Sequence, residues 1–132
     1  MNYLLDTNTC IAIMKGNLRT IERLAACSTD DCAVSTISVY ELKTGVAKCA
    51  DPAKENRKVS ALLEKLAILN FDDEAASNSA RIRADLELKG KMIGPYDVLI
   101  AGQAVTNSLV VVTGNLREFS RIPGLIIEDW NE

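Results

Sequence analysis

Short, mostly apolar runs recur along the chain and are separated by longer amphipathic stretches. Runs of this kind cover residues 2–5, 32–35, 68–71, 109–112 and 125–127. They are continuous rather than alternating, which is typical of strands buried on both faces of a sheet. We therefore predict strands over these residues, and the run at 109–112 is the most strand-like.

The stretches between these runs carry apolar residues at helical spacing. Acidic caps mark several helix starts, and Pro95 suits a first helical position because it lacks an N–H group that would be unpaired there. The predicted helices begin at or next to Thr7, Leu18, Ser38, Pro52, Asp73 and Pro95.

Strands separated by helices indicate an α/β fold, with a parallel sheet covered by helices on both faces and right-handed connections. At 132 residues the chain is expected to form one domain, residues 1–132. In such sheets, sites lie beyond the carboxyl ends of the strands. Asp6 and residues 113–115 follow two of the predicted strands, so we expect them at that edge.

Composition narrows the class of protein. A net charge of −3 argues against a protein that coats nucleic acid, but not against an enzyme that grips a short RNA locally. No apolar run approaches the roughly 20 residues of a membrane span, and the chain starts directly in a strand pattern without a secretory signal. These features predict a cytoplasmic protein with no membrane partner. The chain has no histidine, so its chemistry would rest on carboxylates and metal.

Three carboxylates, Asp6, Glu41 and Asp97, stand where a predicted strand ends or a predicted helix begins. Each alone has a structural explanation. Asp6 can cap a helix, Glu41 can complete a capping box with Ser38, and Asp97 is a favourable charge in a first helical turn. Together they predict more, because a strand-end crevice would bring them close, and close carboxylates repel unless a cation neutralises them. Mg²⁺ or Mn²⁺ suits such a site, since both prefer oxygen ligands.

The chemistry that follows is metal-assisted cleavage of a phosphodiester bond. Asp6 and Asp97 are the predicted metal ligands, either direct or water-bridged. Glu41 is predicted to position the attacking water or to act as the general base. The helix starts at Glu41 and Asp97 would favour the ionised acids and an approaching phosphate.

Other residues have both a functional and a structural explanation. The hydroxyls of Thr7 and Thr113 either orient Asp6 or hold a phosphate oxygen, or they cap a helix and end a strand. Asn115 is either a neutral member of the pocket or a left-handed turn residue. Four basic residues form either part of an RNA-facing rim or a solvated helix face: Arg81, Arg83, Lys89 and Lys91.

Five segments, in order, resemble the PIN-domain ribonucleases, and within them the VapC toxins of bacterial toxin–antitoxin pairs. The segments are LLDTN (4–8), SVYEL (38–42), IGPYD (93–97), VTGNLREF (112–119) and the closing stretch 124–130. The resemblance covers nearly the whole chain and matches Asp6, Glu41 and Asp97 to the first three acids of the family.

This resemblance implies a three-layer α/β/α sandwich around a mostly parallel sheet of about five strands. It implies a Mg²⁺-dependent endoribonuclease, with Mn²⁺ as a substitute, that arrests growth by cutting RNA and forms a homodimer. A VapB-type antitoxin would neutralise it near the active site and would carry the contact with operator DNA. The favoured substrate is initiator tRNA, cut in the anticodon stem-loop.

The chain departs from the pattern of the family at the fourth acid, where many PIN domains have an Asp and this chain has Asn115. Glu118 either substitutes for it or is aimed outward by a helical turn. We therefore expect one well-held cation, joined by a second only when an RNA phosphate takes part. Two alternatives from other classes stay open. One is a receiver-like Mg²⁺-binding signalling domain, and the other is a non-catalytic antitoxin-binding module in which the acids are caps only.

Overall fold

The computed structural model describes residues 1–131, in which strands and helices alternate as the sequence predicts. The strands are β1 (Tyr3–Leu5), β2 (Cys32–Ser35), β3 (Ala67–Leu69), β4 (Val110–Val112) and β5 (Ile127–Glu128). The helices are α1 (Thr7–Met14), α2 (Leu18–Ala26), α3 (Thr36–Lys48), α4 (Pro52–Leu63), α5 (Asp73–Leu88), α6 (Pro95–Asn107) and the short α7 (Leu116–Phe119). None of these helices is both long enough and apolar enough to cross a membrane.

The sheet is parallel in every pairing and has the order β3-β2-β1-β4-β5. Its central strand is β1, where Leu5 lies opposite Val34 on one side and Val112 on the other. The chain builds one half of the sheet from β1 to β3 and then returns to the far side of β1 for β4 and β5. Such a reversal leaves a crevice at the carboxyl ends of the strands, where ligands bind in open α/β sheets. Receiver domains have the order 2-1-3-4-5, so the receiver-like alternative is wrong.

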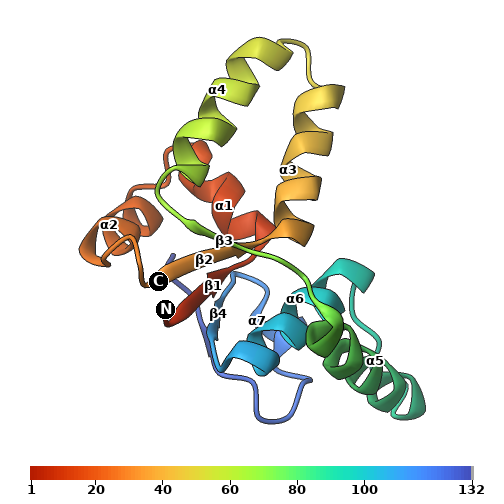
Figure 1. Ribbon diagram of the computed structural model, residues 1–132. Coiled ribbons are helices and arrows are strands. Elements are labelled where there is room, and N and C mark those ends of the chain that lie inside the picture. Colours follow the sequence, from red (N-terminus) through yellow and green to blue (C-terminus); the bar gives the residue numbers. More distant parts are fainter. Residues whose placement is uncertain (132) are drawn as a thin grey trace.

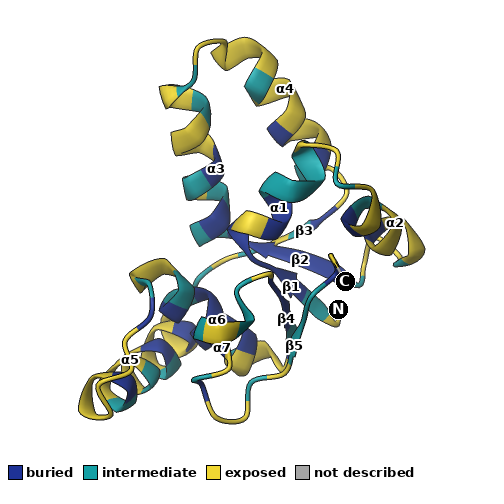
Figure 2. Ribbon diagram, turned by 180° about the vertical axis from the view of Figure 1, so that it is seen from behind, coloured by how far each residue is buried: buried dark blue, intermediate teal, exposed yellow. Residues whose placement is uncertain are grey.

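Helices cover both faces of the sheet, which confirms the predicted three-layer sandwich (Figure 1). Consecutive strand residues point to opposite faces, so Leu4 and Leu5 enter different cores. Leu5 packs with residues of α1, α2 and α4, whereas Leu4 packs with residues of α5, α6 and α7. Figure 2 shows the strands buried between these layers, while the hairpin of α3 and α4 reaches beyond the sheet with a largely exposed tip.

In the helical layer that contains α5, α6 and α7, helices α5 and α6 pack against each other at two small residues, Ser79 and Gly102. A Cβ atom added at Gly102 would lie only 2.8 Å from the Cα atom of Ser79. The next residue, Gln103, is fully buried and donates from Nε2 to the carbonyl oxygen of Leu69 at 2.9 Å. This bond ties α6 to the edge strand β3, and the close packing holds α6 against α5.

The predicted start of α3 is wrong. The helix begins at Thr36, two residues before Ser38, because Ser35 caps it by accepting a hydrogen bond on Oγ from Ile37 N at 3.0 Å. The expected capping box between Ser38 and Glu41 is therefore absent. Both side chains lie within the helix and contact a neighbouring element instead.

Two edge strands also differ from their predicted bounds. β3 ends at Leu69 rather than at residue 71, because Phe71 N donates to Thr36 Oγ1 at 3.2 Å and leaves the ladder. β5 begins at Ile127, whereas the apolar run predicts 125–127. β5 pairs with β4 only through Ile127 and Glu128, so its bounds follow this short pairing rather than the apolar run.

Candidate active site

Asp6 lies at the carboxyl end of the central strand, where β1 turns into α1. Its backbone N donates to Val112 O at 3.0 Å, and its Oδ1 accepts from Thr9 N at 2.8 Å, so the expected helix cap is confirmed. Only 2% of the residue is exposed. Burial raises the pKa of this carboxyl, and hydrogen bonds from Thr113 and Thr9 oppose the rise. The same bonds hold the carboxyl group in the crevice.

Glu41 reaches the crevice from α3 and is held by α1. The hydroxyl of Thr7 donates to Glu41 Oε1 at 2.7 Å, and its oxygen lies 2.9 Å from the buried Oγ of Ser38. The hydroxyl of Thr7 has a single proton, which it donates to the hydrogen bond with Glu41. Its oxygen therefore accepts a hydrogen bond from the hydroxyl of Ser38. Thr7 thus orients Glu41, an acid 34 positions away in sequence, whereas the sequence suggested Asp6 or a phosphate as its partner.

Asp97 is the third residue of α6 and is half-buried. Burial is the largest cause that raises the pKa of its carboxyl to about 7, followed by a hydrogen bond and like charge from Glu118 and then by the charges of Asp6 and Glu41. Gly94 borders this pair of acids, since a Cβ atom there would lie 3.4 Å from Asp97 Oδ2 and 4.0 Å from Glu118 Oε2. The charges of Asp6, Glu41 and Glu118 all act on Asp97, so the structure brings the three predicted acids near one another, with Glu118 among them.

Glu118 points into the site rather than outward, and Asn115 holds it there. Asn115 Nδ2 donates to Glu118 Oε2 at 2.8 Å, and Asn115 N donates to Thr113 Oγ1 at 2.8 Å. The φ angle of Asn115 is −95°, so the left-handed turn considered for it is wrong. The spacing along the chain gave no clear signal for this contact, because a capping box would pair each side chain with a backbone N–H group, whereas here the two side chains bond each other.

These four acids form an oxygen-only donor set: Asp6, Glu41, Asp97 and Glu118. None of them forms an ion pair within residues 1–131. In the same part of the chain, no three acidic or thiol side chains converge tightly enough to enclose a metal ion unaided. Mg²⁺ fits this looser arrangement, because it keeps several waters and takes only one or two carboxylates directly. The contact between Asp97 and Glu118 is the place where added positive charge would relieve most repulsion.

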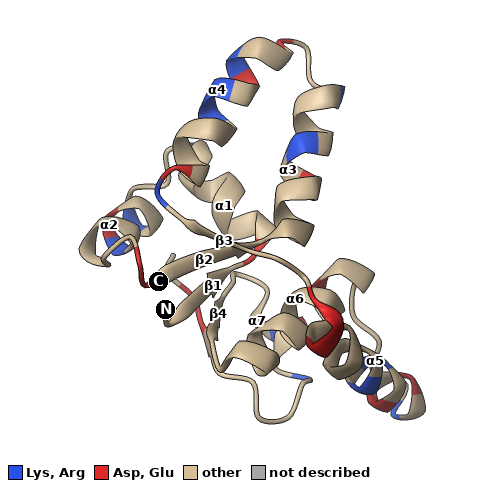
Figure 3. Cartoon of the chain, in the orientation of Figure 1, with Lys and Arg blue, Asp and Glu red and all other residues tan. Residues whose placement is uncertain are grey.

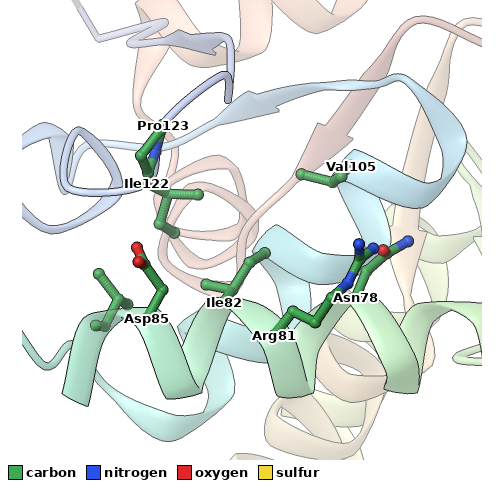
Figure 4. A pocket seen from close by; sticks show the side chains of 8 residues that line it. Asn78, Arg81, Ile82, Asp85, Val105, Ile122 and Pro123 are labelled. Atoms are coloured by element: carbon green, nitrogen blue, oxygen red, sulfur yellow. The ribbon is translucent and has the colours of Figure 1, made fainter. Parts of the chain in front are cut away.

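The four basic residues considered for an RNA rim lie on α5 or just after it. Arg83 pairs with Glu87 at 2.9 Å and Lys89 with Asp85 at 3.0 Å, both across one helical turn. Arg81 lines a pocket of about 230 Å³ between α5, α6 and the loop before β5, and none of the four acids lines that pocket (Figure 4). Figure 3 shows further basic residues on α3 and α4. The rim role of Arg81, Arg83, Lys89 and Lys91 stays a prediction.

Metal-free protein is expected to lose stability as the pH rises from 5 to 8, and Glu118→Gln is expected to reduce that loss. The folded-state pKa of Asp97, about 7, lies above its ordinary value of 3.8. Stability from this group is therefore present below about pH 4 and is lost as the pH rises through 7. Removing the charge of Glu118 lowers the folded-state pKa of Asp97. The gap between the folded-state pKa and the ordinary pKa of this carboxyl then narrows, and with it the loss of stability. Melting temperatures in EDTA at pH 5, 6, 7 and 8 test this.

The matched control for that prediction is Glu87→Gln, which removes the same charge from an exposed pair with Arg83. Its melting temperature is expected to follow the wild-type pH profile, because exposed pairs contribute little. Identical profiles for wild type and Glu118→Gln would show that Glu118 does not act on Asp97.

The chain is similar to a known family, to named relatives and to solved structures. A family model described as "PIN domain" matches residues 3–125. The tRNA(fMet)-specific endonuclease VapC of Salmonella typhimurium is 42% identical over 130 residues, which is 98% of each chain. Ribonuclease VapC2 of Rickettsia felis is 38% identical over 136 residues and covers 100% of both chains. Among solved structures, DNA-bound VapBC from Salmonella typhimurium superposes with a TM-score of 0.94 at 42% identity, over 98% of each chain.

Proposed function

Since this chain belongs to the PIN-domain family, and within it to the VapC ribonucleases, we propose that it is the toxin of a type II toxin–antitoxin pair and cleaves RNA as a metal-dependent endoribonuclease. The observation that carries this proposal is the gathering of Asp6, Glu41 and Asp97 at the switch point of the sheet. Folding alone does not favour like charges in a half-buried crevice. An acid whose pKa is strongly raised by burial and by neighbouring charges is a candidate for catalysis, and Asp97 is such a group.

In the proposed mechanism, Asp6 and Asp97 hold Mg²⁺, for which Mn²⁺ substitutes. When bound, the cation supplies an activated water and stabilises charge on the scissile phosphate. Glu41 orients the attacking water or takes its proton, and the hydrogen bond from Thr7 sets the direction of its carboxylate. The N-terminus of α6 has no side-chain cap, so its first free N–H groups can receive a phosphate oxygen.

Thr7, Thr113, Asn115 and Glu118 support the site in this proposal. Thr113 and Thr7 hold two of the acids, and Asn115 holds Glu118 as the fourth. An amide in place of the usual acid at Asn115 removes one charge, and Glu118 restores it from the first turn of α7. We infer one well-held cation, with a second joining only together with an RNA phosphate.

The proposed substrate is initiator tRNA, cut in its anticodon stem-loop. Support comes from the Salmonella typhimurium relative, whose name gives it as specific for tRNA(fMet). The proposed partner is a VapB-type antitoxin that carries the contact with operator DNA, supported by the similarity to a DNA-bound VapBC complex. A homodimer and a cytoplasmic location complete the proposal on the strength of the family resemblance.

Purified protein is expected to cleave tRNA in Mg²⁺ or Mn²⁺, to stop when EDTA is added, and to resume when Mg²⁺ is restored in excess. Within residues 1–131 none of the four acids forms an ion pair, so removal of the cation should remove activity. A cleavage map on total tRNA identifies the target and the cut position. Asp97→Asn protein, purified in parallel, controls for contaminating nuclease. Absence of cleavage of every RNA tested, with either metal, would favour the non-catalytic antitoxin-binding module.

A further inference from the structure

Two exposed tyrosines meet beside the acids, one from each side of the crevice. Tyr40 of α3 is 55% exposed and Tyr96 of α6 is 41% exposed. Their rings are arranged edge-to-face, with centroids 5.8 Å apart and planes at 61°, and their hydroxyl oxygens are 3.4 Å apart. Each tyrosine directly precedes one of the acids, Glu41 or Asp97. The hydrogen bond and charge of Tyr40 are the largest causes that raise the pKa of the Tyr96 hydroxyl, and the charge of Glu41 raises it further, so the aromatic pair lies near this acid and joins α3 to α6.

The chemistry of this surface fits a nucleic-acid base. Exposed aromatic rings bind unpaired bases by stacking, and this binding tolerates sequence because every base has a π-face. Lys43 lies one turn along α3 from Tyr40, on the same side of the helix, and is exposed without an ion pair among the described residues. Aromatic rings that can stack on a base, a cation that can contact the RNA backbone and the acids of the proposed cleavage site thus occur together.

We propose that Tyr40 and Tyr96 form a stacking platform for an unpaired base next to the scissile phosphate, and that Lys43 contacts a neighbouring phosphate. This inference rests on the proposed ribonuclease function and adds to it the residues that hold the base beside the cut. A base inside a duplex has no free face, so the platform selects RNA with an unpaired nucleotide beside the cut. Tyr40 and Tyr96 are positioning residues, since they orient the substrate and do not take part in the reaction.

Cleavage kinetics on a short single-stranded RNA test the platform. Tyr40→Ala and Tyr96→Ala are each expected to lower kcat/KM by about 10-fold, mainly through KM, in line with the loss of one stacked base. Tyr→Phe variants should keep near wild-type values and Tyr→Trp variants should equal or exceed them, because stacking requires the ring and not the hydroxyl. Val105→Ala and Ile126→Ala, at exposed apolar residues outside the site, are expected to leave kcat/KM unchanged.

A second experiment uses a set of RNAs in which a single abasic nucleotide is moved one position at a time. A purely structural role of the tyrosines would not make cleavage depend on the position of the missing base. With the abasic nucleotide at one position next to the cut, the kcat/KM of the wild type should fall by the same factor as an alanine substitution lowers it on intact RNA. The kcat/KM of the alanine variants should not fall further on that abasic RNA. Wild-type kinetics in both alanine variants would overturn the platform and leave the ribonuclease proposal intact. A loss that follows dissociation of a dimer, measured by sedimentation, would overturn it in favour of a contact between copies. An inactive wild type would overturn both proposals.

Discussion

Replacing Asp97 with asparagine is expected to lower RNA cleavage by about 1,000-fold or more, which equals about 4 kcal/mol at 25 °C. Asp97 is the acid whose pKa burial and Glu118 raise to about 7, so its ionised form gains most from a bound cation. Asparagine keeps the shape of the side chain and removes the charge that holds the metal. Initial cleavage rates in saturating Mg²⁺, with melting temperatures alongside, provide the measurement.

Asp6→Asn extends the test to the buried end of the site and is expected to lower the rate of RNA cleavage by a comparable factor. Asparagine caps helices about as well as aspartate, so the bond from Thr9 N is retained and the fold should survive. Asp85→Asn is the matched control, since it removes the same charge from an exposed pair with Lys89 on α5. Its activity should stay within about twofold of wild type. Full activity in either active-site variant would leave these acids as helix caps only.

Gly102→Ala is expected to lower the free energy of unfolding by about 3 kcal/mol, at the upper end of overpacking effects. The added methyl group would overlap Ser79 Oγ and lie 2.8 Å from Ser79 Cα, so the backbone of α5 has to move. The shift displaces α6, whose first turn carries Asp97, so activity should fall as well. Urea unfolding gives the change in stability.

Gly45→Ala in α3 is the matched control and is expected to have the opposite sign. A Cβ atom at Gly45 would meet nothing within 4 Å, so the substitution adds helix propensity without a clash. The expected gain is about 0.5–1 kcal/mol. Gly102→Ala protein as stable as wild type would show that α5 and α6 tolerate a wider separation than their packing indicates.

The alternation of strands and helices was predictable because it depends on local properties. Continuous apolar runs mark strands buried on both faces, and each core strand was found within a residue or two of its run. Asp6 could be placed for the same reason, since a charge that directly follows a buried strand lies at the carboxyl edge of the sheet. Asp97 was located by the proline and glycine that start its helix. The start of α3 was missed because Ser35, and not Ser38, supplies the cap.

The sequence by itself thus determined the α/β class, the two layers of helices and the edge of the sheet at which the acids lie. Only the tertiary structure decided which side chains meet there. Thr7 orients Glu41 across 34 positions, and Tyr40 meets Tyr96 across 56. Glu118 turns toward Asp97 because Asn115 holds it. Periodicity reports what one segment buries, whereas contacts between distant segments depend on strand order and helix packing, which no single segment encodes.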